Sequence, residues 1–235
     1  MEPFFFGRNN HLFGIFHPNM SAESRGAILV APPLLTETIR THYALKEISV
    51  GLSKVGFDVL RFDFSGCGDS AGDLREITVE HWVEDLREAA EELKALTGET
   101  QVSSFSARFS SALVALLSAR MRWKSTVLWD PLLSGKNWIE QLEYVRSLLL
   151  NHQLTDSHEY LGELTSPGFT ESLAAIDAAQ ISAMRVVAIV TDDQSQVDPQ
   201  WESRKLSFDS AWRRPFTENL FSHLVISETV SILTE

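Results

Sequence analysis

Short apolar runs that alternate with amphipathic segments constrain the fold of this chain more than any other feature. Three of these runs lie in GAILVAPPLL, STVLWDPLL and MRVVAIVTDD, and a fourth strand-like segment, FDVLRFDF, leads into a glycine-rich loop. Continuous apolar runs of this length are typical of strands that are buried on both faces of a sheet. The segments between them repeat apolar residues near every 3.6 positions, as helices do. The alternation predicts an α/β fold, a three-layer sandwich around a mainly parallel sheet.

The remaining elements are predicted from periodicity and from the residues that start and stop them. PFFFG and the partly alternating HLFGIFHP fit an antiparallel hairpin ahead of the sheet. A last strand is expected near 204–212. Thr78 is a candidate N-cap and Gly98 a C-terminal stop for one of the helices. Helices are expected over four segments, which are 39–56, 79–98, 136–150 and 220–234.

Segment 151–182 is weakly patterned and contains Pro167 and Gly168. We interpret this segment as a small cap or insertion. The chain of 235 residues is long enough for one large α/β domain or two small ones. We expect a single domain over 1–235 that carries the cap within it.

Composition excludes several classes of function. The formal charge of −12 argues against nucleic-acid binding, which depends on Lys and Arg at phosphates. The single cysteine, Cys67, excludes an intramolecular disulfide and favours a reducing compartment. There is no apolar run of the roughly 20 residues that span a bilayer, no signal-peptide pattern and no paired metal-ligand motif. We therefore expect a soluble cytoplasmic protein without metal or cofactor, and we interpret the acidic run EDLREAAEE as a solvated helix face.

Several motifs in fixed order resemble one family. They are EPFFFG, LFGIFHP, APPLLTE, VLRFDFSGCGDSAGD and LWDPLLSGKNWIEQL, with looser matches in YLGELTSPGFTESLAAIDA and the late RPF. Together they resemble the exosortase A system-associated hydrolases, in the serine aminopeptidase-like branch of the α/β-hydrolase superfamily. The resemblance covers most of the chain and implies the fold and ancestry of a hydrolase. It does not by itself imply activity, because fold does not determine function.

The segment QVSSFSARFSSALVALL predicts a strand, a sharp turn and a helix, and Arg108 stands at the apex of the turn. In α/β hydrolases the nucleophile occupies this strained position, and the residues two before and two after it are small. With Arg108 at the apex, those residues are Ser106 and Ser110, and Ser111 follows. With Ser106 at the apex, Arg108 and Phe109 would fall at crowded positions, so we prefer the first register. The resemblance implies that arginine is frequent at this apex.

Arginine cannot act as the nucleophile, because its guanidinium stays protonated and has no lone pair to offer. A positive charge at a helix N-terminus is opposed by the helix dipole, so we expect an anion near Arg108. One candidate is an internal salt bridge with Asp130, Asp192 or Asp193. The other is a bound ligand, a small anionic or acyl molecule, held with help from N–H groups of the following helix.

A serine triad in this fold needs an acid after the sixth or seventh strand and a histidine after the last strand. Asp130, Asp192 and Asp193 are weak candidates for the acid, because Asp is common at strand ends. His223 is the only histidine beyond the last predicted strand, and it lies close to or inside the terminal helix. A packed or surface histidine is the simpler interpretation of His223.

The backbone donors of an oxyanion hole would be Phe109 and Leu34, since Pro33 has no N–H. These donors can survive although the nucleophile is absent. A relocated nucleophile could come only from four side chains, which are Ser106, Ser110, Ser111 and Cys67.

Three hypotheses follow. The first is a non-catalytic binding or accessory protein, for example a partner in polysaccharide or protein-export machinery. The second is an active ester, thioester or amide hydrolase with a relocated nucleophile. The third is a purely structural partner, such as a homodimer formed through the hairpin edge.

Overall fold

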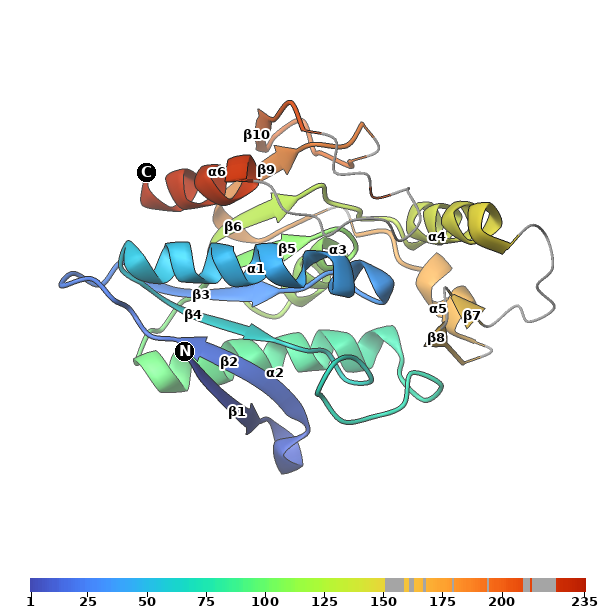
Figure 1. The fold of residues 1–235 in the computed structure, drawn as a ribbon, viewed down its shortest axis with the longest axis horizontal. Helices are drawn as coiled ribbons and strands as arrows, with labels where there is room; N and C mark the ends of the chain where they lie inside the picture. The colour runs from blue at the N-terminus through green and yellow to red at the C-terminus, as the bar shows by residue number, and fades with distance from the viewer. Residues whose placement is uncertain are drawn as a thin grey trace.

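The computed structural model describes residues 1–150, 159–160, 163–166, 168–178, 180–193, 195–208, 212 and 223–235. An eight-stranded sheet with the order β1-β2-β4-β3-β5-β6-β9-β10 forms its centre (Figure 1). The strands are β1 (Glu2–Phe6), β2 (Leu12–His17), β3 (Gly26–Ala31), β4 (Phe57–Phe62), β5 (Ser103–Ala107), β6 (Trp123–Trp129), β9 (Ala183–Val190) and β10 (Glu202–Lys205).

The pairing of these strands confirms the predicted mixed sheet. β1 pairs with β2, and β2 with β4, in antiparallel fashion, so the N-terminal hairpin lies at one edge. The pairs β4–β3, β3–β5, β5–β6, β6–β9 and β9–β10 are all parallel. Parallel strands place their carboxyl ends at one edge of a sheet, where ligands of such folds bind. The turns after β3, β4, β5, β6 and β9 therefore meet at that edge.

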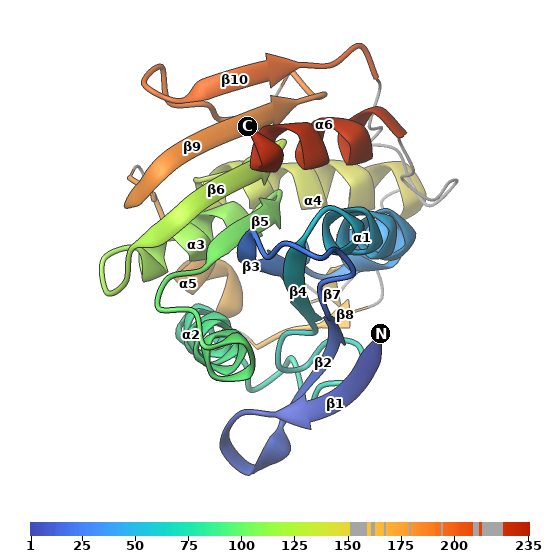
Figure 2. The same cartoon turned by 90° about the vertical axis from the view of Figure 1, so that its left-hand side faces the viewer.

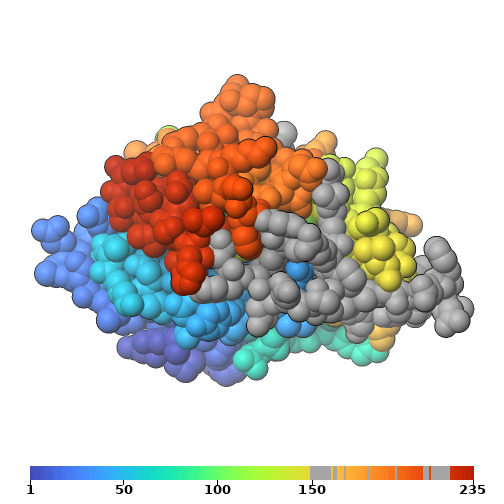
Figure 3. All heavy atoms as spheres, turned by 45° about the horizontal axis from the view of Figure 1, so that its top comes forward, coloured from blue at the N-terminus to red at the C-terminus, as the bar shows by residue number. Residues whose placement is uncertain are grey.

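Helices cover both faces of the sheet. They are η1 (Arg8–Asn10), α1 (Thr36–Lys54), α2 (Val79–Thr97), α3 (Ser110–Leu117), α4 (Gly135–Leu150), α5 (Phe169–Ala174) and α6 (His223–Thr234). Figure 2 shows α1 and α6 on one face, with α2 and α3 on the other. The pair α1 and α6 also lies side by side at the surface in cyan and red (Figure 3). One buried apolar cluster fills each interface, which confirms the three-layer sandwich.

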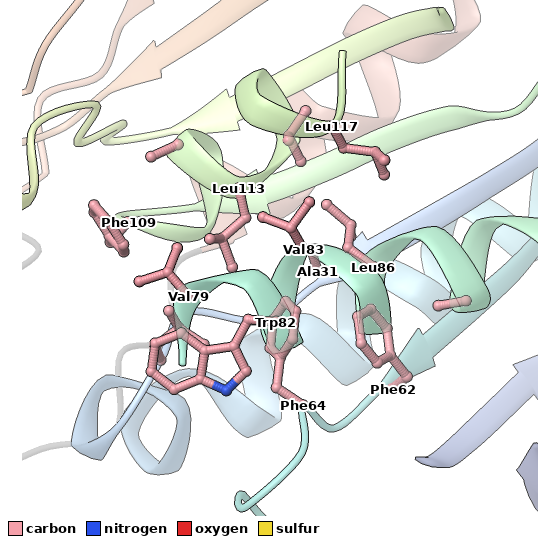
Figure 4. Packing of buried hydrophobic residues seen from close by; sticks show 14 of the residues in the cluster. Ala31, Phe62, Phe64, Val79, Trp82, Val83, Leu86, Phe109, Leu113 and Leu117 are labelled. Carbon is pink, nitrogen blue, oxygen red and sulfur yellow. The ribbon is translucent and has the colours of Figure 1, made fainter. Parts of the chain in front are cut away.

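Helix α2 shows how the sequence specifies this packing. Thr78 accepts a hydrogen bond from the His81 N–H and the His81 ring accepts one from the Thr78 N–H, which together form a capping box. Gly98 ends the helix in the left-handed conformation, with φ of 75°. Both predicted boundaries are thus confirmed. In the apolar stripe, Trp82 packs against Phe64, while Val79, Val83 and Leu86 lie toward α3 (Figure 4).

Part of the acidic run on α2 is not solvated as expected. Asp85 is buried, and its carboxylate accepts hydrogen bonds from the Ser65 N–H at 2.8 Å and the Ser65 hydroxyl at 3.0 Å. His11 Nε2 lies 3.3 Å from the same carboxylate. The interpretation of EDLREAAEE as a solvated face is therefore wrong for Asp85, which anchors the loop after β4 and the N-terminal hairpin. Its neighbours Glu84 and Glu88 keep more solvent contact.

Several predicted boundaries shift. α1 begins at Thr36 rather than near 39, and the last strand ends at Lys205, whereas 209–211 lie outside the described residues. β10 is short because ESRK is a polar edge segment with little to bury. Within 151–182 the structure describes a small hairpin, β7 (Glu159–Tyr160) with β8 (Glu163–Leu164), followed by α5. None of the helices in the described part of the chain is long and apolar enough to cross a membrane.

Candidate functional site

Arg108 lies in the turn between β5 and α3 with φ of 58°. Few non-glycine residues adopt a positive φ, and such a conformation costs on the order of 1–3 kcal/mol. Small residues on both sides make the turn sterically feasible, since Ser106 and Ser110 are fully buried. The Arg108 N–H donates to the Trp129 carbonyl at 3.0 Å, which ties the turn to β6. The backbone is thus that of a strained strand-to-helix turn with a guanidinium at its apex. We call this turn, residues 107–110, the elbow.

The Arg108 side chain is enclosed and paired inside the protein. Only 1% of its surface is exposed. Its Nε donates to Glu37 Oε1 at 3.0 Å, and its Nη2 donates to the Gln141 side-chain oxygen. Its Nη1 lies 4.0 Å from Asp192 Oδ2, and the guanidinium lies over the Trp212 ring at 4.8 Å. A buried charge needs such partners, because desolvation of an unpaired guanidinium is costly.

Asp130, the acid after β6, faces neutral donors instead of Arg108. Its carboxylate accepts the Thr191 N–H at 2.6 Å, the Asp192 N–H at 2.9 Å and the Ser195 hydroxyl at 2.8 Å. The indole Nε1–H of Trp212 donates to its other oxygen at 2.7 Å. A triad acid would instead accept a hydrogen bond from histidine. Trp212 therefore makes the contact with the acid that a catalytic histidine would make.

The other two triad candidates, Asp193 and His223, are exposed at the surface. His223 is the first residue of α6, and Asp193 lies after β9. The sequence from 206 to 222 contains no histidine. Among the described residues, the hydrogen bonds of Asp130 involve no imidazole.

The serines around the turn have structural partners. Ser106 and Ser111 share a hydrogen bond of 3.2 Å, and Ser110 donates to the Ala107 carbonyl at 2.7 Å. All three serines are fully buried, and no hydrogen bond among the described residues links them to a histidine. A serine nucleophile needs an adjacent base, so these hydroxyls have the contacts of packing residues.

The two proposed oxyanion donors occupy buried turns. Leu34 lies within the turn after β3, just before the N-cap Leu35, and Phe109 follows Arg108. The Phe109 ring stacks on Trp138 of α4, with centroids 4.6 Å apart. Leu35 has φ of 54°, so the turn after β3 is strained as well. Phe109, Trp138 and Leu34 thus place buried apolar side chains around the two backbone donors.

A cavity of about 1060 Å³ lies beside the elbow, between α1, the loop after β4 and β8. Leu35, Ile39, Cys67, Leu74 and Leu164 contribute apolar surface. The charged or titratable side chains along its wall are His42, Asp63, Asp69, Asp73, Arg75 and Glu163. Arg108 does not line it. The first turn of α1 thus contributes Glu37 to the elbow, and Thr38 and Ile39 to the cavity wall.

The wall of this cavity is shaped by the glycine-rich loop after β4. Asp63 Oδ2 accepts the Asp69 N–H at 3.1 Å, and the Asp63 carbonyl accepts the Ser70 hydroxyl at 2.5 Å. Gly68 has φ of 55°, and a side chain there would collide with the Asp63 carboxylate. The glycines of this loop therefore serve close backbone approach, which gives Asp63 a fixed place on the cavity wall.

Burial changes the acidity of three groups on this wall. It raises the pKa of Glu163 to about 7 and raises the pKa of Asp63 above its ordinary value. The Asp69 N–H and His42 act on Asp63 in the opposite direction. Burial, together with the Glu163 charge, raises the pKa of the Cys67 thiol to about 12. A thiol this weakly acidic is almost entirely protonated at neutral pH, which disfavours Cys67 as a nucleophile.

Sequence reasoning missed Glu37, Gln141, Trp212 and Glu163. The signal for Glu37 was available, because a strand order with β3 beside β5 brings the turns after these strands together. A carboxylate at the second position of the helix after β3 then falls next to the elbow. The positions of Gln141 and Trp212 depend on how α4 and the chain after β10 fold back over the sheet edge, which the residue pattern does not show.

No family model and no curated protein sequence matches the chain. Solved structures match nearly its whole length. Est1E from Butyrivibrio proteoclasticus with bound ferulic acid matches with a TM-score of 0.67 and 14% identity, over 95% of this chain and 94% of that one. An alpha-beta serine hydrolase homologue from Coxiella burnetii gives 0.58 and 14%, over 99% and 95%.

Mouse alpha/beta hydrolase domain-containing protein 10 gives a TM-score of 0.57 and 15% identity, over 100% of this chain and 97% of that one. Identities this low carry the fold and not the activity. Together with the mixed sheet and its strained turn after β5, they establish that the chain has the α/β-hydrolase fold.

Proposed function

We propose that this chain is a non-catalytic binding or accessory protein built on the α/β-hydrolase fold. The observation that carries the proposal is the buried pairing of Arg108 at the nucleophile position with Glu37 and Gln141. A guanidinium cannot attack a carbonyl carbon. Its side chain is also 1% exposed, whereas the nucleophile of this fold must be exposed at the top of the sheet.

The acid position supports the same proposal. In a serine hydrolase the acid orients a histidine, which then activates the nucleophile. Here Asp130 accepts the Trp212 indole N–H, and an indole is a donor only and cannot take up a proton. The relay from acid to base to nucleophile thus has no base among the described residues.

The internal salt bridge is the better-supported partner for the Arg108 charge. Glu37 Oε1 at 3.0 Å and Asp192 Oδ2 at 4.0 Å already surround the guanidinium with negative charge. An anionic or acyl ligand at this point would face both carboxylates. Asp192 is one of the three predicted partners, Glu37 is an additional one, and Asp130 is engaged with other donors.

The finer assignments belong to the proposal. Membership of the exosortase A system-associated branch, a single domain with a cap at 151–182, and a cytoplasmic location remain inferences from the motifs and composition. A protein partner or a homodimer formed through the hairpin edge is compatible with the exposed side of β1, where Phe5 is 53% exposed.

The test is activity-based labelling of the purified chain with a fluorophosphonate probe, together with assays on short and medium p-nitrophenyl esters. We expect neither labelling nor turnover above a boiled control. The variants Ser106→Ala, Ser110→Ala and Ser111→Ala identify a labelled serine. If labelling occurs and only one of these variants abolishes it, the proposal is overturned in favour of a relocated nucleophile.

Cys67 requires a separate assay. At pH 7 a thiol with a pKa of about 12 has roughly 1000-fold less thiolate than an ordinary cysteine. We therefore expect iodoacetamide to modify Cys67 far more slowly than it modifies glutathione. Modification as fast as that of glutathione, with ester turnover lost in Cys67→Ser, would make this thiol a nucleophile and contradict the proposal.

A further inference from the structure

The cavity between α1 and the loop after β4 has room for an organic ligand. Its volume of about 1060 Å³ is at the upper end of the range for sites that bind drug-sized molecules. It is bordered by elements from three separate parts of the chain, namely the first turns of α1, the loop at 63–75 and β8. The elbow contributes no side chain to it among the described residues.

Apolar side chains on the cavity wall can contact the uncharged part of a ligand. Leu35, Leu74 and Leu164 line the cavity, and Ile39 lies at its border with 69% of its surface exposed. Burying the exposed apolar surface of an isoleucine beside a cavity is favourable, because it removes that surface from water. A ligand with an aliphatic or aromatic body would bury this surface.

The charged side chains on the cavity wall also determine which ligands can bind, and their net charge is negative. Arg75 is engaged by Asp73, whose two oxygens lie 2.9 and 3.0 Å from its Nε, so these two charges offset each other. The carboxyl groups that remain on the wall are Asp63, Asp69 and Glu163, against one imidazole, His42. Arg61 lies outside the lining and acts electrostatically on Asp63, so Glu163 is the carboxylate with the least compensation. The net charge of the whole chain, −12, adds a long-range field of the same sign.

Glu163 is the member of this set that most needs a partner. No hydrogen bond or ion pair with another described residue engages its carboxyl group, and burial alone raises its pKa to about 7. Its charge also opposes that of a Cys67 thiolate across the cavity. A cation beside Glu163 would offset the cost of its desolvation, because opposite charge favours the ionised carboxylate.

We infer that the cavity formed by α1, the loop at 63–75 and β8 binds an organic cation, a molecule with an ammonium group on an apolar body. The ammonium group lies toward Glu163 and Asp63, and the body lies along Leu35, Ile39 and Leu74. This inference deepens the proposed function, since it names the ligand class of the binding protein. The anionic or acyl ligand expected from the sequence concerned Arg108, which does not line this cavity, and an anion in the cavity would be repelled by these carboxylates.

The test compares three eight-carbon probes by isothermal titration calorimetry at pH 8: octylammonium, octanol and octanoate. Octylammonium stays protonated at this pH, because alkylamines ionise near the pKa of lysine. We expect saturable binding of octylammonium that is about tenfold tighter than that of octanol, the lower end of what hydrogen bonding to a charged group contributes. Octanoate is expected to bind least.

Three variants locate the site, and circular dichroism checks that each is folded. Glu163→Gln and Asp63→Asn should each weaken octylammonium binding at least fivefold. Ile39→Lys changes an exposed side chain, so it should fold normally, weaken octylammonium and strengthen octanoate. Glu76→Gln is the matched control, because it removes one exposed carboxylate outside the cavity lining and should change affinity less than twofold.

The inference is overturned if octylammonium does not bind saturably, if octanoate binds as tightly, or if the cavity variants behave like Glu76→Gln. The outcome is separable from that of the labelling assay. Absent cation binding with no fluorophosphonate labelling rejects the ligand class and leaves the non-catalytic proposal standing. Labelling at a defined serine rejects the non-catalytic proposal whether or not the cation binds.

Discussion

The elbow and the neighbouring cavity lie at the same edge of the sheet. They differ in whether their charged side chains are paired with opposite charges inside the protein. At the elbow, Arg108 is 1% exposed and pairs with Glu37 from α1. In the cavity, Glu163 has no paired cation among the described residues, and Asp63 is contacted by a backbone N–H. The start of α1 contributes to both regions, with Glu37 at the elbow while Leu35 and Ile39 line the cavity.

At one edge of the sheet, an enclosed and charge-paired turn thus lies next to an open cavity with acidic walls. A strained apex with φ of 58° persists, yet its side chain now holds α1 and α4 together through Glu37 and Gln141. Charges that are matched inside the protein stabilise it, whereas unmatched charges beside open space are available to a ligand. The elbow is therefore expected to act on stability, and the cavity on binding.

Removing the elbow charge should have the largest effect. In Arg108→Met, Glu37 stays buried and loses the guanidinium that binds it at 3.0 Å, with the electrostatic effect of Arg40 remaining. Breaking such a buried pair costs about 3–5 kcal/mol of unfolding free energy, and we expect the lower end. Urea denaturation measures this loss. The double variant with Glu37→Met should recover much of it, because replacing both charges by apolar side chains is often neutral. A loss below about 1 kcal/mol in the single variant would show that the pair does not stabilise the elbow.

Removing one donor behind the elbow should have a smaller effect. Trp212→Phe deletes the indole N–H that donates to Asp130 at 2.7 Å. It also weakens the cation–π interaction between the aromatic ring and the Arg108 guanidinium. A buried acceptor that is left without a partner costs about 1–3 kcal/mol. Asp130 keeps four other donors, one of which is the Thr191 hydroxyl on the same oxygen, so we expect a loss at the lower end of this range. Urea denaturation should show this loss, and Trp201→Phe is the matched control on a half-buried tryptophan. Equal losses of unfolding free energy in the two variants would show that the Trp212–Asp130 hydrogen bond does not contribute to stability.

The sequence was sufficient for the fold, since strands and helices follow from local periodicity and boundary residues such as Thr78 and Gly98. It was also sufficient to locate Arg108 at the apex, because only that register puts small serines on both sides. It could not supply Glu37 or Trp212, whose contacts join positions far apart in the chain. Asp85 shows the same limit, because a charged residue on a helix is buried when a loop brings donors to it.

The cavity gives the smallest effect on stability and the clearest contrast with the elbow. The folded-state pKa of Glu163, about 7, lies above its ordinary value. The folded state then holds a proton more tightly than the unfolded state, so this group lowers stability as pH rises from about 4.5 to 7, and the penalty persists above pH 7. Glu163→Gln removes the penalty and should raise the unfolding free energy at pH 8, but not at pH 4.5, by about 1 kcal/mol or less because the group is partly solvated.

Thermal and urea unfolding at pH 4.5 and pH 8 measure this difference, with Glu76→Gln as the pH-independent control. If Glu163→Gln is more stable than the parent at pH 8 and also binds octylammonium more weakly, then Glu163 lowers the stability of the fold and contributes to ligand binding. Arg108→Met should show the reverse pattern, because its loss destabilises the protein and leaves the cavity wall unchanged. If Glu163→Gln instead lowers stability at pH 8, the carboxylate has an internal role and the two regions do not differ in the way described.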